Sequence, residues 1–391
     1  MGQPKRVLLL HNRYQIAGGE DVVVQTEKAL LEANDHPVAL LETNNDDIAS
    51  PLEKAKAATN AIYSYSSKQW VRAEIASFLP DVVHVHNFFP LLSPSVYYAC
   101  REAGVPVVQT LHNYRLLCPD VYFFREGKVC EDCLGKFFPW PAIVHGCYHG
   151  SRAGTAVVAT MLSTHRALQT WTKMVDVYIA LTEFARQKFI QGGLPANKIV
   201  VKPNFIHPDP REGEGQGRYA LFVGRLSPEK GLETLLKAWE KIGERMPLKI
   251  VGEGSLANVV AEASQKLLGV EWLGKQPKEQ VLALMKEAQV LVFPSMWYEG
   301  FPLVIVEAYA VGLPVIASDL GSPSLLIDQG RTGLHFRPGD SEDLVAKVEW
   351  ALTHSTELAQ MRREARAEFE AKYTAQQNYQ MLMDIYERVK G

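Results

Sequence analysis

Two glutamates, eight positions apart, stand in an apolar stretch of this chain between Val290 and Asp319. Glu299 lies in a glycine-containing loop after a predicted buried strand, and Glu307 lies inside the short apolar helix predicted after that loop. Carboxylates in such surroundings are costly to bury unless each has a partner. Either Glu299 is an exposed loop acid and Glu307 a satisfied structural one, or both face a polar ligand at the strand ends, where open α/β sheets bind ligands. We favour the interpretation that both carboxylates face a ligand.

Two cations form a second candidate group. Gly224 ends a predicted strand and is followed by Arg225 and, five positions later, by Lys230, beside the start of a predicted helix. An arginine fork, a lysine point charge and the free amides of a helix N-terminus together suit a diphosphate. Two solvated surface cations are the alternative. Gly252 and Gly254 repeat the strand–glycine–helix pattern further along the chain.

A glycine pair opens the amino-terminal half. Gly18 and Gly19 connect a predicted strand over 5–12 to a predicted helix over 21–33. Such a junction directs backbone N–H groups and a helix dipole at an anion. A tight turn that needs two glycines explains the pair about as well.

Histidines end two further predicted strands. His84 and His86 share one face of the strand over 81–87, because side chains alternate between faces every second residue. They are a structural pair or a functional one. His112 ends the strand over 106–113, which places it on the ligand side of the sheet, so we give it more weight than His84.

The segment 114–150 breaks the alternation of strands and helices and holds four cysteines. Cys130-x-x-Cys133, flanked by Cys118 and Cys147, predicts a structural zinc site, although the outer spacings are irregular. Four reduced thiols in a packed excursion are an equal alternative. A redox role is a third option, but the strand-to-helix context of thioredoxin-like motifs is missing. In each case the insert supports the rim of a cleft rather than the chemistry.

The order of predicted elements indicates two domains. An α/β domain over 1–205 contains the cysteine insert, and the Pro- and Gly-containing segment 206–218 is a linker. A second α/β domain covers 219–375, and the helical sequence that begins near 342 ends in a helix over 376–391 that crosses back to the first domain. Two doubly wound, Rossmann-like domains facing one another follow from this pattern. The strands expected in the second domain are 219–223, 248–251, 270–273, 290–293 and 314–317.

Composition limits the classes of function. A chain of 391 residues exceeds one ordinary core, and a net charge of −3 gives no reason to expect nucleic-acid binding. The apolar run near the start is too short for a signal peptide, and no segment approaches the ~20 apolar residues that span a bilayer. We therefore expect a cytoplasmic protein. The apolar segments Phe88–Leu92 and Phe137–Trp140 hint at a lipid-linked acceptor or peripheral contact at the inner face of a membrane; internal packing is the alternative.

The motifs occur in a specific order: a G-R-x₄-K-G turn at 224–231, a G-x-G turn at 252–254, and an E-x₇-E pair at Glu299 and Glu307. In this order the carboxyl-terminal half resembles that of the family 4 retaining glycosyltransferases, which have the GT-B fold. The amino-terminal half resembles the family through the Gly18–Gly19 loop, the strand that ends in His112, and Pro203-Asn204 before the linker. The resemblance covers nearly the whole chain apart from the cysteine insert.

The resemblance implies roles for the second domain. Arg225 and Lys230 would hold the diphosphate of a nucleotide-diphospho-sugar and stabilise the leaving nucleotide. Glu307 would bind the ribose hydroxyls, and Glu299 the hydroxyls of the transferred sugar. The backbone amides that support the phosphate and sugar would be those of Phe301, Leu303 and Val304.

For the first domain, the resemblance implies that Gly18 and Gly19 close over the phosphate and that His112 contacts the sugar near its reacting centre. The leaving phosphate would deprotonate the acceptor hydroxyl on the same face, so neither a side-chain nucleophile nor a catalytic metal ion is expected. The function implied is hexosyl transfer to a sugar or lipid-linked acceptor in polysaccharide, lipopolysaccharide or glycolipid assembly. A non-hydrolysing nucleotide-sugar epimerase and a non-catalytic nucleotide-binding protein are the alternatives.

Two positions depart from the family pattern. Pro302 stands where many relatives carry glycine, which removes one amide donor but favours the start of a helix. The turn Gly321–Leu326 lacks a glutamate that relatives often carry there, so a contact to sugar or phosphate is missing or replaced.

Overall fold

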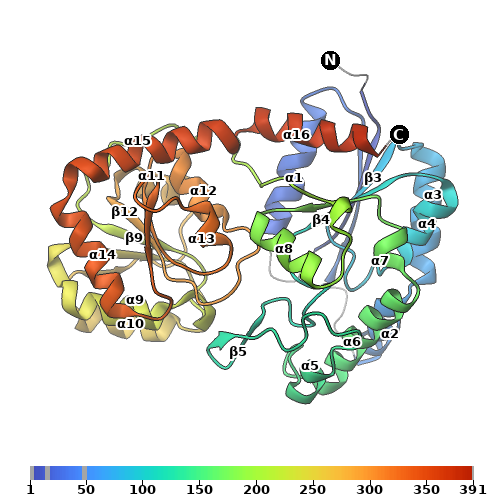
Figure 1. Cartoon of the computed structure of the whole chain (residues 1–391), viewed down its shortest axis with the longest axis horizontal. Helices are drawn as coiled ribbons and strands as arrows, with labels where there is room; N and C mark the ends of the chain where they lie inside the picture. The colour runs from blue at the N-terminus through green and yellow to red at the C-terminus, as the bar shows by residue number, and fades with distance from the viewer. Residues whose placement is uncertain (1–3, 14–17, 46–50, 390–391) are drawn as a thin grey trace. The chain divides into compact units, whose positions relative to one another are not determined.

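The computed structural model describes residues 4–13, 18–45 and 51–389, with the side chains of 51–56 left out. The chain divides into two compact units (Figure 1). Within the described residues, unit 1 comprises the chain up to Phe123, then Cys130–Pro203, and the end of the chain from Asn378. Unit 2 comprises the hairpin segment Phe124–Val129 and Asn204–Gln377.

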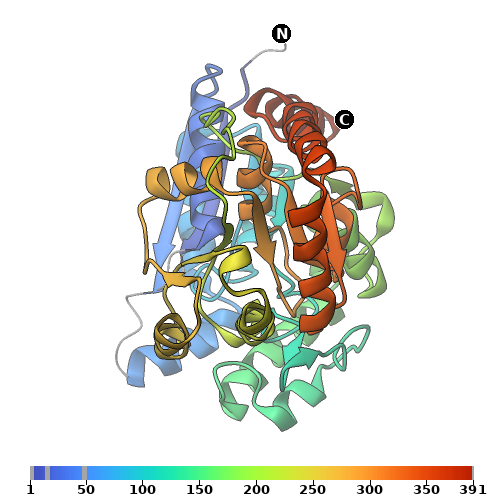
Figure 2. The same cartoon turned by 90° about the vertical axis from the view of Figure 1, so that its left-hand side faces the viewer.

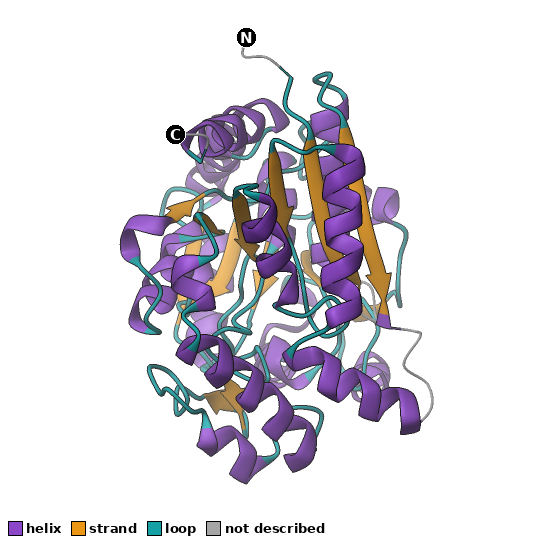
Figure 3. Cartoon of the chain, turned by 90° about the vertical axis from the view of Figure 1, so that its right-hand side faces the viewer, coloured by secondary structure: helices purple, strands orange, loops and turns teal. Residues whose placement is uncertain are grey.

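Unit 1 is built on a sheet of six parallel strands in the order β2-β1-β3-β4-β7-β8. Figure 3 shows these strands side by side with helices packed against them. The strands are β1 (Val7–Arg13), β2 (Val38–Asn44), β3 (Val82–Val85), β4 (Val107–Leu111), β7 (Val177–Ala180) and β8 (Ile199–Val201). Its helices are α1 (Gly19–Glu32), α2 (Pro51–Ile62), α3 (Tyr65–Phe78), α4 (Ser95–Ala103), α5 (Trp140–His145), α6 (Arg152–Ala167), α7 (Thr170–Lys173) and α8 (Glu183–Gln191).

Unit 2 repeats the design with six parallel strands in the order β11-β10-β9-β12-β13-β14 (Figure 2). The strands are β9 (Ala220–Val223), β10 (Leu248–Val251), β11 (Val270–Trp272), β12 (Val290–Phe293), β13 (Val315–Ser318) and β14 (Gly333–Phe336). The helices are α9 (Leu232–Ile242), α10 (Ala257–Lys266), α11 (Lys278–Glu287), α12 (Leu303–Ala310), α13 (Ser322–Leu326), α14 (Ser341–Thr353) and α15 (Ser355–Lys372). The hairpin of β5 (Phe124–Arg125) and β6 (Lys128–Val129) also belongs to this unit.

The sheets confirm the predicted fold class, two doubly wound α/β domains. The two six-stranded sheets contain one additional strand: β14 was not predicted, because four residues that include the half-buried His335 give a weak pattern. The hairpin of β5 and β6 was not predicted either. The helical sequence after 342 is divided into separate helices, the last of which is α16 (Ala375–Arg388). From Asn378 onwards this helix packs on unit 1, where Leu382, Ile385 and Tyr386 join the core beneath β1 and β3.

The segment predicted as a linker has no regular secondary structure, but it is attached to unit 2 by specific contacts. Both carboxylate oxygens of Asp209 accept hydrogen bonds from Arg366 on α15, at 2.8 and 2.7 Å. The Gly213 amide donates to the carbonyl of Val311 at 3.0 Å. The segment is therefore part of the unit 2 surface and not a free tether.

Each sheet has one place where the strand order reverses, between β1 and β3 in unit 1 and between β9 and β12 in unit 2. Doubly wound proteins bind ligands at such reversals, outside the carboxyl ends of the strands. In the described residues, no helix is both long enough and apolar enough to cross a membrane.

Candidate active site

Glu299 and Lys230 meet at the strand reversal of unit 2. Lys230 follows the turn after β9, Glu299 follows β12, and Lys230 Nζ donates to Glu299 Oε1 at 2.6 Å. The same oxygen accepts from Ser295 Oγ at 2.6 Å and from Trp297 Nε1 at 2.8 Å. Glu299 is 6% exposed, so it is neither the exposed loop acid of the structural alternative nor an unpartnered buried charge.

Close backbone packing brings these loops together. Gly231, directly after Lys230, has a φ of +71°, and a Cβ there would lie 1.9 Å from the carbonyl oxygen of Pro294. Gly252 is equally restricted, since its Cβ would lie 1.8 Å from the carbonyl oxygen of Gly224. These two glycines are needed because any side chain would separate the ends of β9, β10 and β12.

Arg225 lies in the same turn but has a different partner. Its Nη2 is 3.2 Å from Glu229 Oε1, and Ser227 Oγ donates to that oxygen at 2.6 Å. The Arg225 side chain is 45% exposed. The structure thus brings Lys230, but not Arg225, to Glu299, and leaves the guanidinium accessible to a ligand.

Glu307 occupies a separate position on α12. The backbone amides of Leu303 and Val304 lie in the first turn of this helix, directly after Phe301 and Pro302. The Glu307 carboxylate is 3.9 Å from Lys278 Nζ. Burial raises its pKa and Lys278 lowers it in part, with a net increase. The two glutamates therefore have different lysine partners.

Ser322 lies in the turn that begins at Gly321, the segment that lacks a glutamate. Its hydroxyl lies 2.8 Å from the carbonyl oxygen of Glu299 and 3.2 Å from that of Gly300. Ser322 therefore supports the loop that carries Glu299.

In unit 1, the glycine pair begins α1. Gly18 is the N-cap residue and Gly19 the first residue of the helix. The Gly18 amide donates to Asp21 Oδ2 at 2.8 Å, so this predicted phosphate donor is already engaged within the helix terminus. A Cβ at Gly18 would meet nothing within 4 Å, so open space adjoins this helix start.

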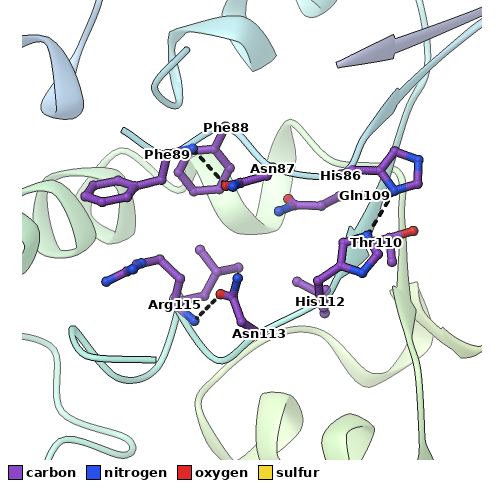
Figure 4. Close-up of a pocket in the computed structure, with 11 residues that line it drawn as sticks. His86, Asn87, Phe88, Phe89, Gln109, Thr110, His112, Asn113 and Arg115 are labelled. Carbon is purple, nitrogen blue, oxygen red and sulfur yellow. Dashed lines mark hydrogen bonds between the residues drawn. The ribbon is translucent and has the colours of Figure 1, made fainter. Parts of the chain in front are cut away.

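His112 borders a pocket in unit 1 that lies beyond the ends of β3 and β4. Figure 4 shows its ring directed at His86, whose Nδ1 is 2.9 Å from His112 Nε2. Phe88, Phe89 and Arg115 line the other side of the pocket. The guanidinium of Arg115 lies over the Phe89 ring, 4.6 Å from its centroid.

The apolar segment Phe88–Leu92 is packed inside unit 1. Phe88 and Phe89 are 3% and 2% exposed, and Phe88 contacts the rings of Tyr97 and Trp171. The interpretation of this segment as a surface offered to an apolar acceptor is wrong, because its two phenylalanine side chains are buried in the core of the unit. The second apolar segment differs: Phe137 is 60% exposed.

The four cysteines of the insert are reduced thiols that lie near one another. Burial, with smaller contributions from Asp120 and Cys133, raises the pKa of Cys118 to about 12. Burial, with smaller contributions from Cys147 and Cys130, raises the pKa of Cys133 to about 11. Among the residues that the structure describes, their sulfurs form no group of three close enough to hold a metal ion. The structural zinc stays a prediction, to be checked by elemental analysis of the purified protein.

Several site residues were missed by sequence reasoning. Ser295, Trp297 and Ser322 have no pattern that marks them, because their role depends on where Glu299 lies. Glu27 did have a signal: it occurs on the apolar face of α1, between Val23 and Leu30 at helical spacing, and is 1% exposed.

The fold and the site define the class. Solved GT-B structures superpose along nearly the whole chain: sucrose-phosphate synthase from Thermosynechococcus elongatus with a TM-score of 0.72 at 17% identity, over 98% of both chains, and HepE of Anabaena in complex with UDP with 0.69 at 18% identity, over 98% of this chain and 99% of that one. Residues 16–210 match the model of glycosyltransferase family 4, and residues 207–368 match that of glycosyl transferases group 1. The chain belongs to the family 4 glycosyltransferases.

The curated relatives match this chain over only part of their own length. The glycogen synthase of Mycobacterium tuberculosis is 28% identical over 304 residues, 74% of this chain and 64% of that protein. The phosphatidyl-myo-inositol mannosyltransferase of Mycobacterium leprae is 28% identical over 233 residues, 57% of this chain and 62% of that protein. An uncharacterized glycosyltransferase of Methanocaldococcus jannaschii is 29% identical over 49% of this chain and 54% of its own length. The chain thus matches less than two thirds of these proteins.

Proposed function

We propose that this protein is a retaining glycosyltransferase that moves a sugar from a nucleotide-diphospho-sugar to an acceptor hydroxyl in polysaccharide, lipopolysaccharide or glycolipid assembly. The observation that carries the proposal is the pair of the half-buried Lys230 and the buried Glu299, 2.6 Å apart at the strand reversal of unit 2. A cation and a hydrogen-bond acceptor at one point match the two parts of such a donor, an anionic diphosphate and a hydroxyl-bearing sugar.

The donor roles follow from the positions of the side chains. Lys230 and the accessible Arg225 hold the diphosphate and stabilise the charge that develops on the leaving nucleotide. The amides of Leu303 and Val304, at the positive end of α12, assist them. Glu299 accepts from the sugar hydroxyls and Glu307 from the ribose. UDP in the Anabaena neighbour supports a nucleotide donor.

In unit 1 we assign His112 to the transferred sugar. The chemistry needs neither a metal ion nor a side-chain nucleophile, since the leaving phosphate accepts the proton of the acceptor hydroxyl on the same face. Gly18 and Gly19, next to open space at the start of α1, remain the phosphate-side residues of this unit.

The test is transfer itself. Purified protein is incubated with radiolabelled UDP- and GDP-sugars, with and without a sugar or glycolipid acceptor, in the presence and absence of EDTA. We expect acceptor-dependent transfer with retention of the anomeric configuration, unaffected by EDTA. An epimerised nucleotide sugar formed without acceptor would indicate the epimerase, and binding without turnover a non-catalytic protein.

We propose in addition that the insert contacts a membrane surface peripherally, on its cytoplasmic face. Phe137, Phe138 and Trp140 are 60%, 42% and 56% exposed, and aromatic side chains favour the bilayer interface. Cosedimentation with vesicles of phosphatidylcholine and phosphatidylglycerol should fall in Trp140→Ser. Leu268→Ser, at a more exposed apolar site of unit 2 (73%), is the control. Equal binding of both variants would remove this part of the proposal.

A further inference from the structure

A row of buried polar side chains lies behind His112 in unit 1, and the proposed function assigns none of them. Glu27 comes from α1, His84 lies in β3, His86 follows β3, and Lys202 follows β8; each is at most 3% exposed. The contact between His86 Nδ1 and His112 Nε2, drawn in Figure 4, joins this row to the pocket.

Glu27 is held as a carboxylate. Its Oε2 accepts a hydrogen bond from Lys202 Nζ at 3.0 Å, and its Oε1 lies 3.1 Å from His84 Nδ1. Burial would raise the pKa of Glu27, but the charge of Lys202 and the contacts of His84 and His86 outweigh it, and the pKa lies well below its ordinary value. A fixed negative charge therefore sits beside His86 at neutral pH.

The carboxylate and the two histidines of this row lie within 4.8 Å of one another, the one such donor group in the part of the chain that the structure describes. The remaining contacts favour a hydrogen-bond network over a metal site. Lys202 already supplies the positive charge beside Glu27. Both nitrogens of His84 have partners: Nδ1 lies 2.7 Å from Tyr386 Oη, and Nε2 lies 2.8 Å from Thr110 Oγ1.

The charge of Glu27 decides where the proton of His86 resides. His86 Nε2 is 3.3 Å from Glu27 Oε1. A carboxylate attracts an N–H and repels a nitrogen lone pair, so the proton is on Nε2. Burial, and next the proximity of His84, lower the pKa of His86 to about 4, so the ring is neutral at pH 7.

The proton of His112 then follows. With its proton on Nε2, His86 presents a lone pair at Nδ1, which accepts the N–H of His112 Nε2. Burial, and next the proximity of His86, lower the pKa of His112 well below its ordinary value, so this ring also carries one proton. His112 Nδ1 is left as an acceptor, and it is buried with no hydrogen-bond partner among the residues that the structure describes. Such an unpaired buried acceptor is unfavourable until a donor reaches it.

We propose that Glu27 and His86 are positioning residues that hold His112 in the tautomer with a bare Nδ1, so that His112 accepts a hydrogen bond from a hydroxyl of the transferred sugar. The sugar contact rests on the proposed function; the tautomer does not. An acceptor at this point favours a neutral, hydroxyl-bearing sugar and disfavours one that presents a carboxylate there, because two acceptors repel each other.

The tautomer is measured in the full chain, without substrate, by long-range ¹H–¹⁵N spectra of ¹⁵N-histidine protein at pH 7. The signals of His112 are assigned by their loss in His112→Gln. We expect a pyridine-like Nδ1 and a pyrrole-like Nε2. A proton on Nδ1 instead of Nε2, or a doubly protonated ring, would by itself overturn the inference.

Two replacements of His86 separate positioning from packing. In His86→Gln the amide N–H₂ can face Glu27 and the oxygen can accept from His112, so the spectrum should be kept. His86→Leu has similar size but no acceptor, and the two tautomers of His112 should mix. Tyr386→Phe is the matched control, because it removes a hydroxyl from the His84 side of the row only. An unchanged His112 spectrum in His86→Leu would contradict the proposal.

Kinetics complete the test. We expect kcat to fall by up to about tenfold in His86→Leu, the worth of one hydrogen bond, and to recover in His86→Gln. The Kd for uridine or guanosine diphosphate, measured by calorimetry, should not change. Wild-type protein with the expected spectrum but no transfer would remove the proposed function and the sugar contact, and keep the positioning roles. Transfer by a protein whose His112 carries its proton on Nδ1 would remove this inference alone.

Discussion

Lys230 Nζ and Glu299 Oε1 lie 2.6 Å apart although 69 positions separate the two residues in the chain. Each member of the pair has further contacts. Ser295 and Trp297 also donate to Glu299 Oε1, and Lys230 Nζ lies 5.4 Å from the centroid of the Trp297 ring. A lysine held in this way is a fixed cation that needs no rearrangement to meet a diphosphate.

Removal of the Glu299 carboxylate should affect turnover. In Glu299→Ala we expect kcat to fall by about 10²-fold or more, because the group that orients the sugar in the transition state is lost. The measurement is the initial rate of sugar transfer at saturating donor. Glu262→Ala, which removes an exposed carboxylate paired with Lys266 on α10, should keep the wild-type rate. Near-normal transfer by Glu299→Ala would refute the assignment.

Removal of either cation should weaken nucleotide binding. We expect the Kd for a nucleoside diphosphate to rise by roughly tenfold or more in Lys230→Ala and in Arg225→Ala, since a charge-assisted hydrogen bond contributes about 1.5–3 kcal/mol. Calorimetric titration with UDP and GDP measures the change. Lys237→Ala, in an exposed pair with Glu233, is the control and should bind as the wild type does. Unaltered binding in both site variants would place the diphosphate elsewhere.

Gly231→Ala should displace the loop that carries Lys230. The added methyl group would collide with the carbonyl of Pro294, and the φ of +71° is unfavourable for alanine. Gly330→Ala separates the two costs, because Gly330 has a φ of +81° but nothing within 4 Å of its Cβ position. Thermal melting should show a loss of about 1 kcal/mol in Gly330→Ala from backbone strain alone, and a larger loss with reduced nucleotide binding in Gly231→Ala. Equal losses would mean that the close approach does not matter.

The buried His86 should make folding stability depend on pH. Its pKa is about 4 in the folded protein and 6.5 ordinarily, so between these values the unfolded chain binds more protons. The contribution is complete above pH 6.5 and is lost as the pH falls towards 4, by on the order of 3 kcal/mol at 1.36 kcal/mol for each pKa unit. Urea denaturation at several pH values measures this loss.

His86→Gln provides the comparison for that experiment, because it keeps the hydrogen bonds without a group that titrates in this range. Its stability should fall less steeply than that of the wild type between pH 6.5 and 4. The depressed pKa of Glu27 acts in the same direction below its ordinary value, in both proteins. Parallel curves for the two proteins would show that His86 is not the group responsible.

The sequence by itself determined the fold class and the order of the motifs, because both depend on local pattern. Apolar runs such as Val290–Phe293 and Leu248–Val251 coincide with β12 and β10 residue for residue. Positions such as His112, directly after β4, place a side chain at the ligand edge of a parallel sheet without knowledge of its neighbours.

Only the tertiary structure decided which of these groups meet. The sequence analysis assigned Arg225 and Lys230 to one group. In the structure only Lys230 contacts Glu299, and Arg225 contacts Glu229 instead. It gave no sign that Glu27 lies behind His86. Contacts between residues so distant in the chain depend on how strands are ordered and how closely their loops pack, and no short-range pattern encodes that geometry.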